Sequence, residues 1–229
     1  MKVKSIKKIS IILAVAIILS FLSNGVSTST RSLSDVEAGS MKQLKSSQYK
    51  KMIQGGLTEI EVRRLLGFLT NYQDNRKIKS LNKKNLNFLG RDVANGKQTM
   101  FFDIVYGFDK AKIIDNRRVY SITKTNKLLS SYSNFKFKKW TKYHFSNGEL
   151  STYTDDKYVH PMLGSEGYSA YIIIKTAKYN SQKIDITYEL HDDLEEENLG
   201  HKKVRGIYKA TFMKQKNGKY KLTTIKKTK

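Results

Sequence analysis

Cysteine is missing from this chain of 229 residues. Its absence excludes disulfide bonds, a thiolate nucleophile, a cysteine-ligated zinc site and a lipid anchor on cysteine. Proline and glycine are also scarce, with one proline and 14 glycines, which excludes a collagen-like or low-complexity chain. Without cross-links the fold must rely on its core, and 10 Phe and 14 Tyr residues supply material for one.

Acidic residues are few, because 20 Asp and Glu stand against 43 Lys and Arg, giving a formal net charge of +23. Arginine accounts for only eight of those 43 basic residues. The planar guanidinium of arginine is the group that binds base edges and phosphates at two points, whereas lysine suits diffuse attraction to a polyanion. The composition therefore predicts an anionic cell-wall polymer or membrane surface as partner, and no specific nucleic acid. A lysine-rich solvated surface without a partner is the plainer alternative.

The chain has one long apolar run, residues 9–22, which is shorter than the roughly 20 residues of a spanning helix. It follows four lysines and precedes small polar residues, the order of an export signal. We predict a signal peptide or N-terminal membrane anchor over residues 1–29, a polar, weakly helical leader over 30–56, and a single domain over 57–229. The protein is expected to be exported, and to be secreted or attached to the outer face of the cytoplasmic membrane in a Gram-positive-type envelope.

Two helices are predicted ahead of the strands. Thr58 and Glu61 have the spacing of a capping box, in which each side chain bonds to the backbone N–H of the other residue. Apolar residues then recur at helical spacing, which predicts a helix over residues 59–73. Residues 76–84 carry five positive charges and no acid, and leucines interleave with them, so a second amphipathic helix is expected over 76–89.

Strand periodicity dominates the rest of the chain. Strands are expected over residues 99–108, 118–122, 135–145, 149–153, 168–179, 183–190, 203–214 and 219–225. Residues 126–133 are expected to form a polar loop with a helical turn, and residues 154–167 the longest irregular loop. The predicted fold class is α+β, with one or two N-terminal helices packed on a curved antiparallel sheet of about six to eight strands. This order resembles NTF2-like and cystatin-like layouts, a likeness that implies no function.

Catalytic motifs are absent from the sequence, which contains no GxSxG, Walker or GxGxxG pattern. His160 lies in the long loop near Asp155, Asp156 and Glu166, and it is the best candidate for a general acid or base. A secreted hydrolase with a pocket near His160 is therefore the alternative function. No HxH or HxxxH pair exists and the acidic run at 192–197 lacks the EF-hand spacing, so neither a metal nor a cofactor is predicted.

Two basic surfaces are the candidate binding sites. The first combines an aromatic side chain that can stack on a ligand with neighbouring lysines, and consists of Lys136, Lys138, Trp140 and Lys142. The second is the expected outward face of the C-terminal strands, and consists of Lys203, Arg205, Lys209, Lys219 and Lys221. The leading hypothesis is a non-catalytic extracytoplasmic binding or accessory module. A non-specific nucleic-acid binder is the second alternative, after the hydrolase.

Overall fold

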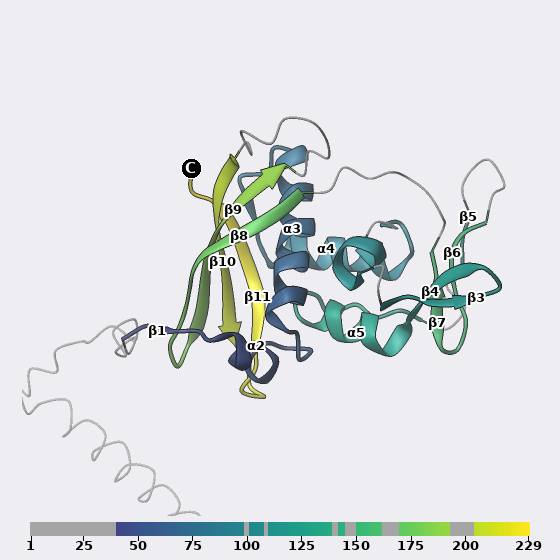
Figure 1. Cartoon of the computed structure of the whole chain (residues 1–229), viewed down its shortest axis with the longest axis horizontal. Coiled ribbons are helices and arrows are strands. Elements are labelled where there is room, and N and C mark those ends of the chain that lie inside the picture. Colours follow the sequence, from purple (N-terminus) through teal and green to yellow (C-terminus); the bar gives the residue numbers. More distant parts are fainter. Residues whose placement is uncertain are drawn as a thin grey trace, which may run out of the picture. The chain divides into compact units, whose positions relative to one another are not determined.

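The computed structural model describes residues 40–98, 101–107, 110–138, 142–144, 150–161, 170–192 and 204–229, and the predicted export signal lies outside them. The predicted α+β class with a large antiparallel sheet is confirmed (Figure 1). The helices of the described residues are α2 (Ser46–Met52), α3 (Glu59–Asn75), α4 (Lys83–Ala94), the π-helix η1 (Phe102–Tyr106) and α5 (Ile122–Ser130).

The larger sheet has six antiparallel strands in the order β1-β8-β9-β10-β11-β2. Its strands are β1 (Lys42–Gln43), β8 (Ala170–Tyr179), β9 (Lys183–Asp192), β10 (Val204–Lys214), β11 (Tyr220–Lys227) and β2 (Ser80–Leu81). The four long strands occupy the segments where the sequence predicts strands. Along β9, Ile184, Ile186, Tyr188 and Leu190 are all fully buried, so the alternation read from the sequence faces the core as expected.

Helix α3 covers the inner face of the larger sheet (Figure 1). Its predicted capping box is present, since the Thr58 N–H donates to Glu61 Oε2 at 2.8 Å and the Glu61 N–H donates to Thr58 Oγ1 at 3.3 Å. Gly67 lets the helix approach β8 closely, because a Cβ there would lie 3.3 Å from the carbonyl oxygen of Ala170.

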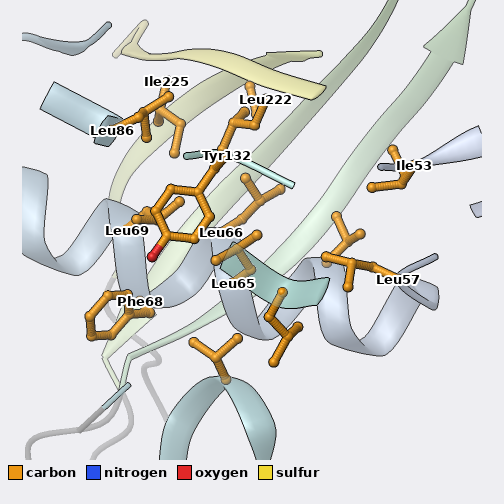
Figure 2. Packing of buried hydrophobic residues seen from close by; sticks show 14 of the residues in the cluster. Ile53, Leu57, Leu65, Leu66, Phe68, Leu69, Leu86, Tyr132, Leu222 and Ile225 are labelled. Atoms are coloured by element: carbon orange, nitrogen blue, oxygen red, sulfur yellow. The ribbon is translucent and has the colours of Figure 1, made fainter. Parts of the chain in front are cut away.

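One hydrophobic core joins these elements. Leu65, Leu66 and Leu69 of α3 are fully buried, and burying each contributes roughly 1.5–3 kcal/mol. Figure 2 shows these leucines between α4, β11 and the turn after α5, which contribute Leu86, Leu222, Ile225 and Tyr132. Tyr49 of α2, in the predicted polar leader, is also buried in this core.

The smaller sheet has five strands in the order β3-β4-β7-β6-β5. Its strands are β3 (Lys112–Ile114), β4 (Arg117–Ser121), β7 (Tyr158–His160), β6 (Leu150–Thr154) and β5 (Lys142–His144). The tight turn between β3 and β4 uses Asp115 and Asn116, both at positive φ, as a type I′ hairpin requires. Part of the long loop predicted over 154–167 is therefore strand β7.

Several local predictions are wrong. The expected strand over 99–108 contains the π-helix η1, because its closely spaced buried residues, Phe102, Val105 and Tyr106, show no periodicity that separates helix from strand. Residues 135–138 are irregular and not the start of a strand. The expected helix over 76–89 is displaced to α4, whose start is fixed by Asn82 Oδ1 accepting the N–H groups of Lys84 and Asn85 at 2.9 and 3.2 Å.

The segment expected over 126–133 to be a polar loop with a helical turn lies mostly in helix α5, so the helical part is longer and begins earlier than predicted. Ser121 caps this helix, since its side-chain oxygen accepts the N–H of Lys124 at 3.4 Å. Thr125 is fully buried and its hydroxyl donates to the Ser121 carbonyl at 2.9 Å. A polar residue therefore lies on the buried face of this helix, with its hydroxyl satisfied by the backbone. Polarity alone gave the wrong prediction, and the position of this helix shapes the candidate site.

Candidate binding site: a basic groove

Arg205 does not lie on the outward face where the strand alternation predicts it. A β-bulge between Val204 and Gly206 interrupts the pairing with β9, and a bulge changes the direction of the side chain that it contains. Arg205 Nη2 lies 2.8 Å from Asp74 Oδ2 at the end of α3, and the side chain also donates to Asn71 Oδ1 and Asn75 Oδ1, each at 2.8 Å. The structure thus gives Arg205 a role in holding β10 to α3.

The other predicted C-terminal residues do not converge on one surface. Lys209 lies on the outer face of the sheet and is paired with Asp185 at 3.0 Å. Lys219 donates to the Lys51 carbonyl, and Lys221 donates to the Ser133 carbonyl at 2.7 Å. Lys203 lies outside the described residues.

The aromatic and lysine set around residue 140 is only partly described. Trp140 lies outside the described residues, and Lys142 belongs to β5, of which the backbone alone is described. Lys136 and Lys138 are exposed, and Lys136 lines a small cavity together with Lys221. Two of the predicted binding residues are therefore brought together.

His160 is held by a carboxylate in the β6–β7 hairpin. Its Nε2 lies 2.7 Å from Asp155 Oδ2, while Asp155 Oδ1 accepts the N–H groups of Lys157 and Tyr158 at 2.6 and 2.5 Å. Burial opposes the charge of Asp155, but the hydrogen bonds from His160 and the two N–H groups hold the pKa of the carboxyl below its usual value. These contacts are those of a residue that stabilises a turn. Within the described segments, no group of three His, Asp or Glu side chains is placed to hold a metal ion.

A groove lined by six lysines lies between α5, the smaller sheet and the loop that precedes α3. It consists of two cavities, of about 420 and 280 Å³, which share Tyr106, Lys110 and Lys124. The lysines of this basic groove are Lys50, Lys110, Lys112, Lys124, Lys127 and Lys157. Among the residues that the structure describes, two carboxylates, Glu61 and Asp156, line it as well.

Tyr106 links the two cavities. Its side chain is buried and packs edge-on against Tyr120, with the ring centroids 5.0 Å apart. Burial raises the pKa of the Tyr106 hydroxyl, so the group stays neutral at physiological pH. Tyr106 is the last residue of the π-helix η1. The helix ends there because the next residue, Gly107, adopts φ 92°, a backbone conformation that glycine tolerates.

The charge of the groove is poorly compensated. Glu61 is occupied by the capping box of α3 and lies 3.7 Å from Lys110 Nζ. Lys112 Nζ lies 5.2 Å from the centre of the Tyr158 ring and donates to its hydroxyl at 3.4 Å. The other four lysines form no ion pair with any carboxylate that the structure describes. Such a concave surface of one sign concentrates anions.

The basic groove is not among the sites predicted from the sequence. Its six lysines come from five separate elements, namely α2, β3, α5, the β6–β7 turn and the loop after η1, so no single stretch of sequence carries them all. The one local signal is the pair Lys124 and Lys127, three residues apart on one face of α5. A spacing of three residues places two lysines on one face only in a helix, and the sequence predicts a loop with a helical turn from residue 126 onward.

Comparison of the chain with protein-family models, with curated proteins and with solved structures gives no match, so the interpretation rests on the residues themselves. Among the helices that the structure describes, none is long and apolar enough to cross a membrane.

Proposed function

We propose that the protein is a non-catalytic, extracytoplasmic binding module whose basic groove holds a segment of an anionic cell-wall polymer. The observation that supports this proposal is the groove itself, which six lysines and two carboxylates of the described residues line. The charge lies in two joined cavities of about 420 and 280 Å³. A flexible polymer chain can enter such a hollow, whereas the flat surface of a bilayer cannot, so a polymer is the better match. The predicted export signal and the excess of lysine over arginine support the same class of partner.

The test compares two variants of equal charge. One replaces Lys112, Lys124 and Lys157 of the groove by alanine. The matched control replaces three lysines that are exposed and lie away from the groove, Lys84, Lys178 and Lys216. Binding of the wild type and both variants to a poly(glycerol phosphate) chain is measured by calorimetry while the salt rises from about 0.05 to about 0.5 M, which shortens the screening length from roughly 14 to roughly 4 Å.

At low salt the groove variant is expected to bind at least about tenfold more weakly than the wild type, since three exposed charge contacts together contribute about 1.5 kcal/mol or more. The control variant should stay within about twofold to threefold of the wild type. Equal losses in the two variants would show that binding follows net charge and would overturn the groove. Affinity that ignores salt would overturn the electrostatic proposal. If the protein bound vesicles containing phosphatidylglycerol through the groove but did not bind the polymer, the wall polymer would be overturned as the partner and the membrane surface would take its place.

A further inference from the structure

Another cavity, separate from the two that form the basic groove, lies beside the first half of β11 and has a volume of about 280 Å³. It shares no lining residue with the basic groove. Backbone hydrogen bonds fix its walls, since the Gln54 N–H donates to the Tyr220 carbonyl and the Leu222 N–H donates to the Ser131 carbonyl, each at 2.8 Å. We call it the edge pocket, and its lining includes Gln54, Asn134, Phe135, Lys136, Gln215 and Lys221.

Hydrogen bonds fix the orientation of two amide groups in the edge pocket. The Lys219 N–H donates to Asn217 Oδ1 at 3.0 Å, so Asn217 turns its Nδ2 to Gln54 Oε1 at 2.9 Å. Because Oε1 of Gln54 is taken, its Nε2 remains as a donor. Lys221 Nζ donates to Asn134 Oδ1 at 2.6 Å, which leaves Asn134 Nδ2 as a donor in the same way.

The ammonium groups of the edge pocket add further donors. Lys136 has no hydrogen bond or ion pair within the described part of the chain. Lys221 uses two of its three N–H groups, and both of its partners are neutral oxygens, Ser133 O and Asn134 Oδ1. Burial and the nearby charge of Lys83 lower the pKa of Lys221, and an anion in the pocket would act in the opposite direction by favouring the charged ammonium group.

Phe135 gives the edge pocket an apolar surface. Its side chain lines the cavity and is 39% exposed, although a large aromatic side chain normally lies in the core. Its backbone is held in place, because the Phe135 N–H donates to Ser133 Oγ at 3.3 Å. A flat apolar ring beside several donors suits a ligand with one apolar face and many acceptor oxygens.

We propose that the edge pocket binds a single acidic sugar unit. The carboxylate or phosphate of the sugar lies on Lys221 and Lys136, its hydroxyl oxygens accept from Gln54 Nε2 and Asn134 Nδ2, and one face of its ring packs on Phe135. Gln215 adds an acceptor for a sugar hydroxyl, because its Nε2 already donates to the Met213 carbonyl at 2.8 Å. A cavity of about 280 Å³ has room for one such unit.

Asn134→Asp is the variant that tests the edge pocket with least disturbance. The aspartate keeps an acceptor for Lys221 and adds an ion pair with it, so the melting temperature should not fall. It also removes the Nδ2 donor and places a negative charge in the cavity. Binding of D-glucuronate, glucose 6-phosphate, D-glucose and inorganic phosphate to the full chain is measured by titration calorimetry at low salt.

The wild type is expected to bind glucuronate or glucose 6-phosphate at least about tenfold more tightly than glucose, and Asn134→Asp should remove that binding. Phe135→Leu should weaken the acidic sugars and leave inorganic phosphate unchanged. Whichever of the two sugars binds more tightly identifies the acidic group. Failure of both acidic sugars to bind, or equal binding of glucose, would overturn the proposal. Unchanged binding in Asn134→Asp, or loss of binding in the groove triple variant, would place the sugar elsewhere and overturn it as well.

Discussion

Replacing Asp74 by alanine is expected to lower the free energy of unfolding by about 3 kcal/mol, since the carboxylate holds two cations and a hydroxyl in a half-buried cluster. Its Oδ1 accepts from the Tyr208 hydroxyl at 2.7 Å and lies 2.9 Å from Lys227 Nζ, and its Oδ2 lies 2.8 Å from Arg205 Nη2. The side chain of Arg205 is only 16% exposed, so removal of the carboxylate leaves a poorly solvated charge without its main partner.

The geometry around Asp74 shows why three donors gather there. Asp74 lies in the last turn of α3, where the helix dipole disfavours a negative charge, so compensating cations are needed. The β-bulge turns Arg205 toward it, and Gly206 leaves room for Lys227. A Cβ at Gly206 would lie 2.7 Å from Lys227 Cε and 3.0 Å from the Lys229 carbonyl oxygen. The cluster thus ties α3, β10 and β11 together at one end of the sheet.

The contribution of Asp74 to stability should depend on pH. Burial acts to raise the pKa of this carboxyl, but hydrogen bonds from Tyr208 and Lys227 and the charges of Lys227 and Arg205 bring it below the usual value. A group whose pKa is lowered by folding stabilises the fold above its unfolded pKa of about 3.9, and that stabilisation disappears as the pH falls through the folded pKa. The difference in unfolding free energy between wild type and Asp74→Ala should therefore be full at pH 7 and shrink below about pH 4.

Urea denaturation at pH 7 and near pH 3 measures this difference directly. Asp74→Asn is the matched control, because it keeps an acceptor for Tyr208 while removing the charge. It should recover part of the stability lost in Asp74→Ala and show no dependence on pH from this site. A difference between wild type and Asp74→Ala that is the same at both pH values would contradict the assigned role of the charge.

The sequence predicts the elements whose signals are local and repeated. The alternation of Ile184, Ile186 and Tyr188 fixes both the strand and its inner face, because a strand turns successive side chains to opposite sides. The pair Thr58 and Glu61 fixes the start of α3, because the capping box lies within one turn of the helix. These features depend on neighbours in sequence, so they needed no knowledge of the fold.

The remaining features depend on residues that meet only in the folded chain. Arg205 lies on the opposite face from the predicted one because a bulge adds one residue to the strand. Gly206 is the local signal of that bulge, and a prediction from alternation alone does not use it. The π-helix at 102–106 was missed because its aromatic residues are buried on every side. The basic groove is hidden for a third reason, since its lysines come from five separate elements and only the packing of α5 beside the smaller sheet brings those elements together.

Gly90→Ala is the second substitution with a large expected effect. It is expected to lower the free energy of unfolding, whereas replacing glycine by alanine inside a helix usually raises it. In a helix interior, alanine is favoured over glycine by about 1 kcal/mol. Gly90 lies inside α4, but a Cβ there would be 2.1 Å from Ser133 Oγ and 2.2 Å from Ser133 Cβ. Ser133 cannot move freely, because its turn is tied to β11 by the bond from the Leu222 N–H to the Ser131 carbonyl at 2.8 Å. Overpacking typically costs about 1–3 kcal/mol, and an overlap this deep is expected near the upper end, so a net loss of about 2 kcal/mol is expected.

A double-mutant cycle with Ser133→Gly separates the clash from other effects of the substitution. Ser133→Gly removes both atoms that the new methyl group would meet, so Gly90→Ala made in that background should stabilise the protein by up to about 1 kcal/mol. Gly67→Ala in α3 serves as a further control, since its Cβ would lie 3.3 Å from the Ala170 carbonyl oxygen, a tight contact but with far less overlap than at Gly90. It should change stability by less than about 1 kcal/mol. The cycle is measured by urea denaturation. Equal effects of Gly90→Ala with and without the Ser133 side chain would contradict the proposed clash. The close approach of α4 to this turn would then not be the reason for glycine at position 90.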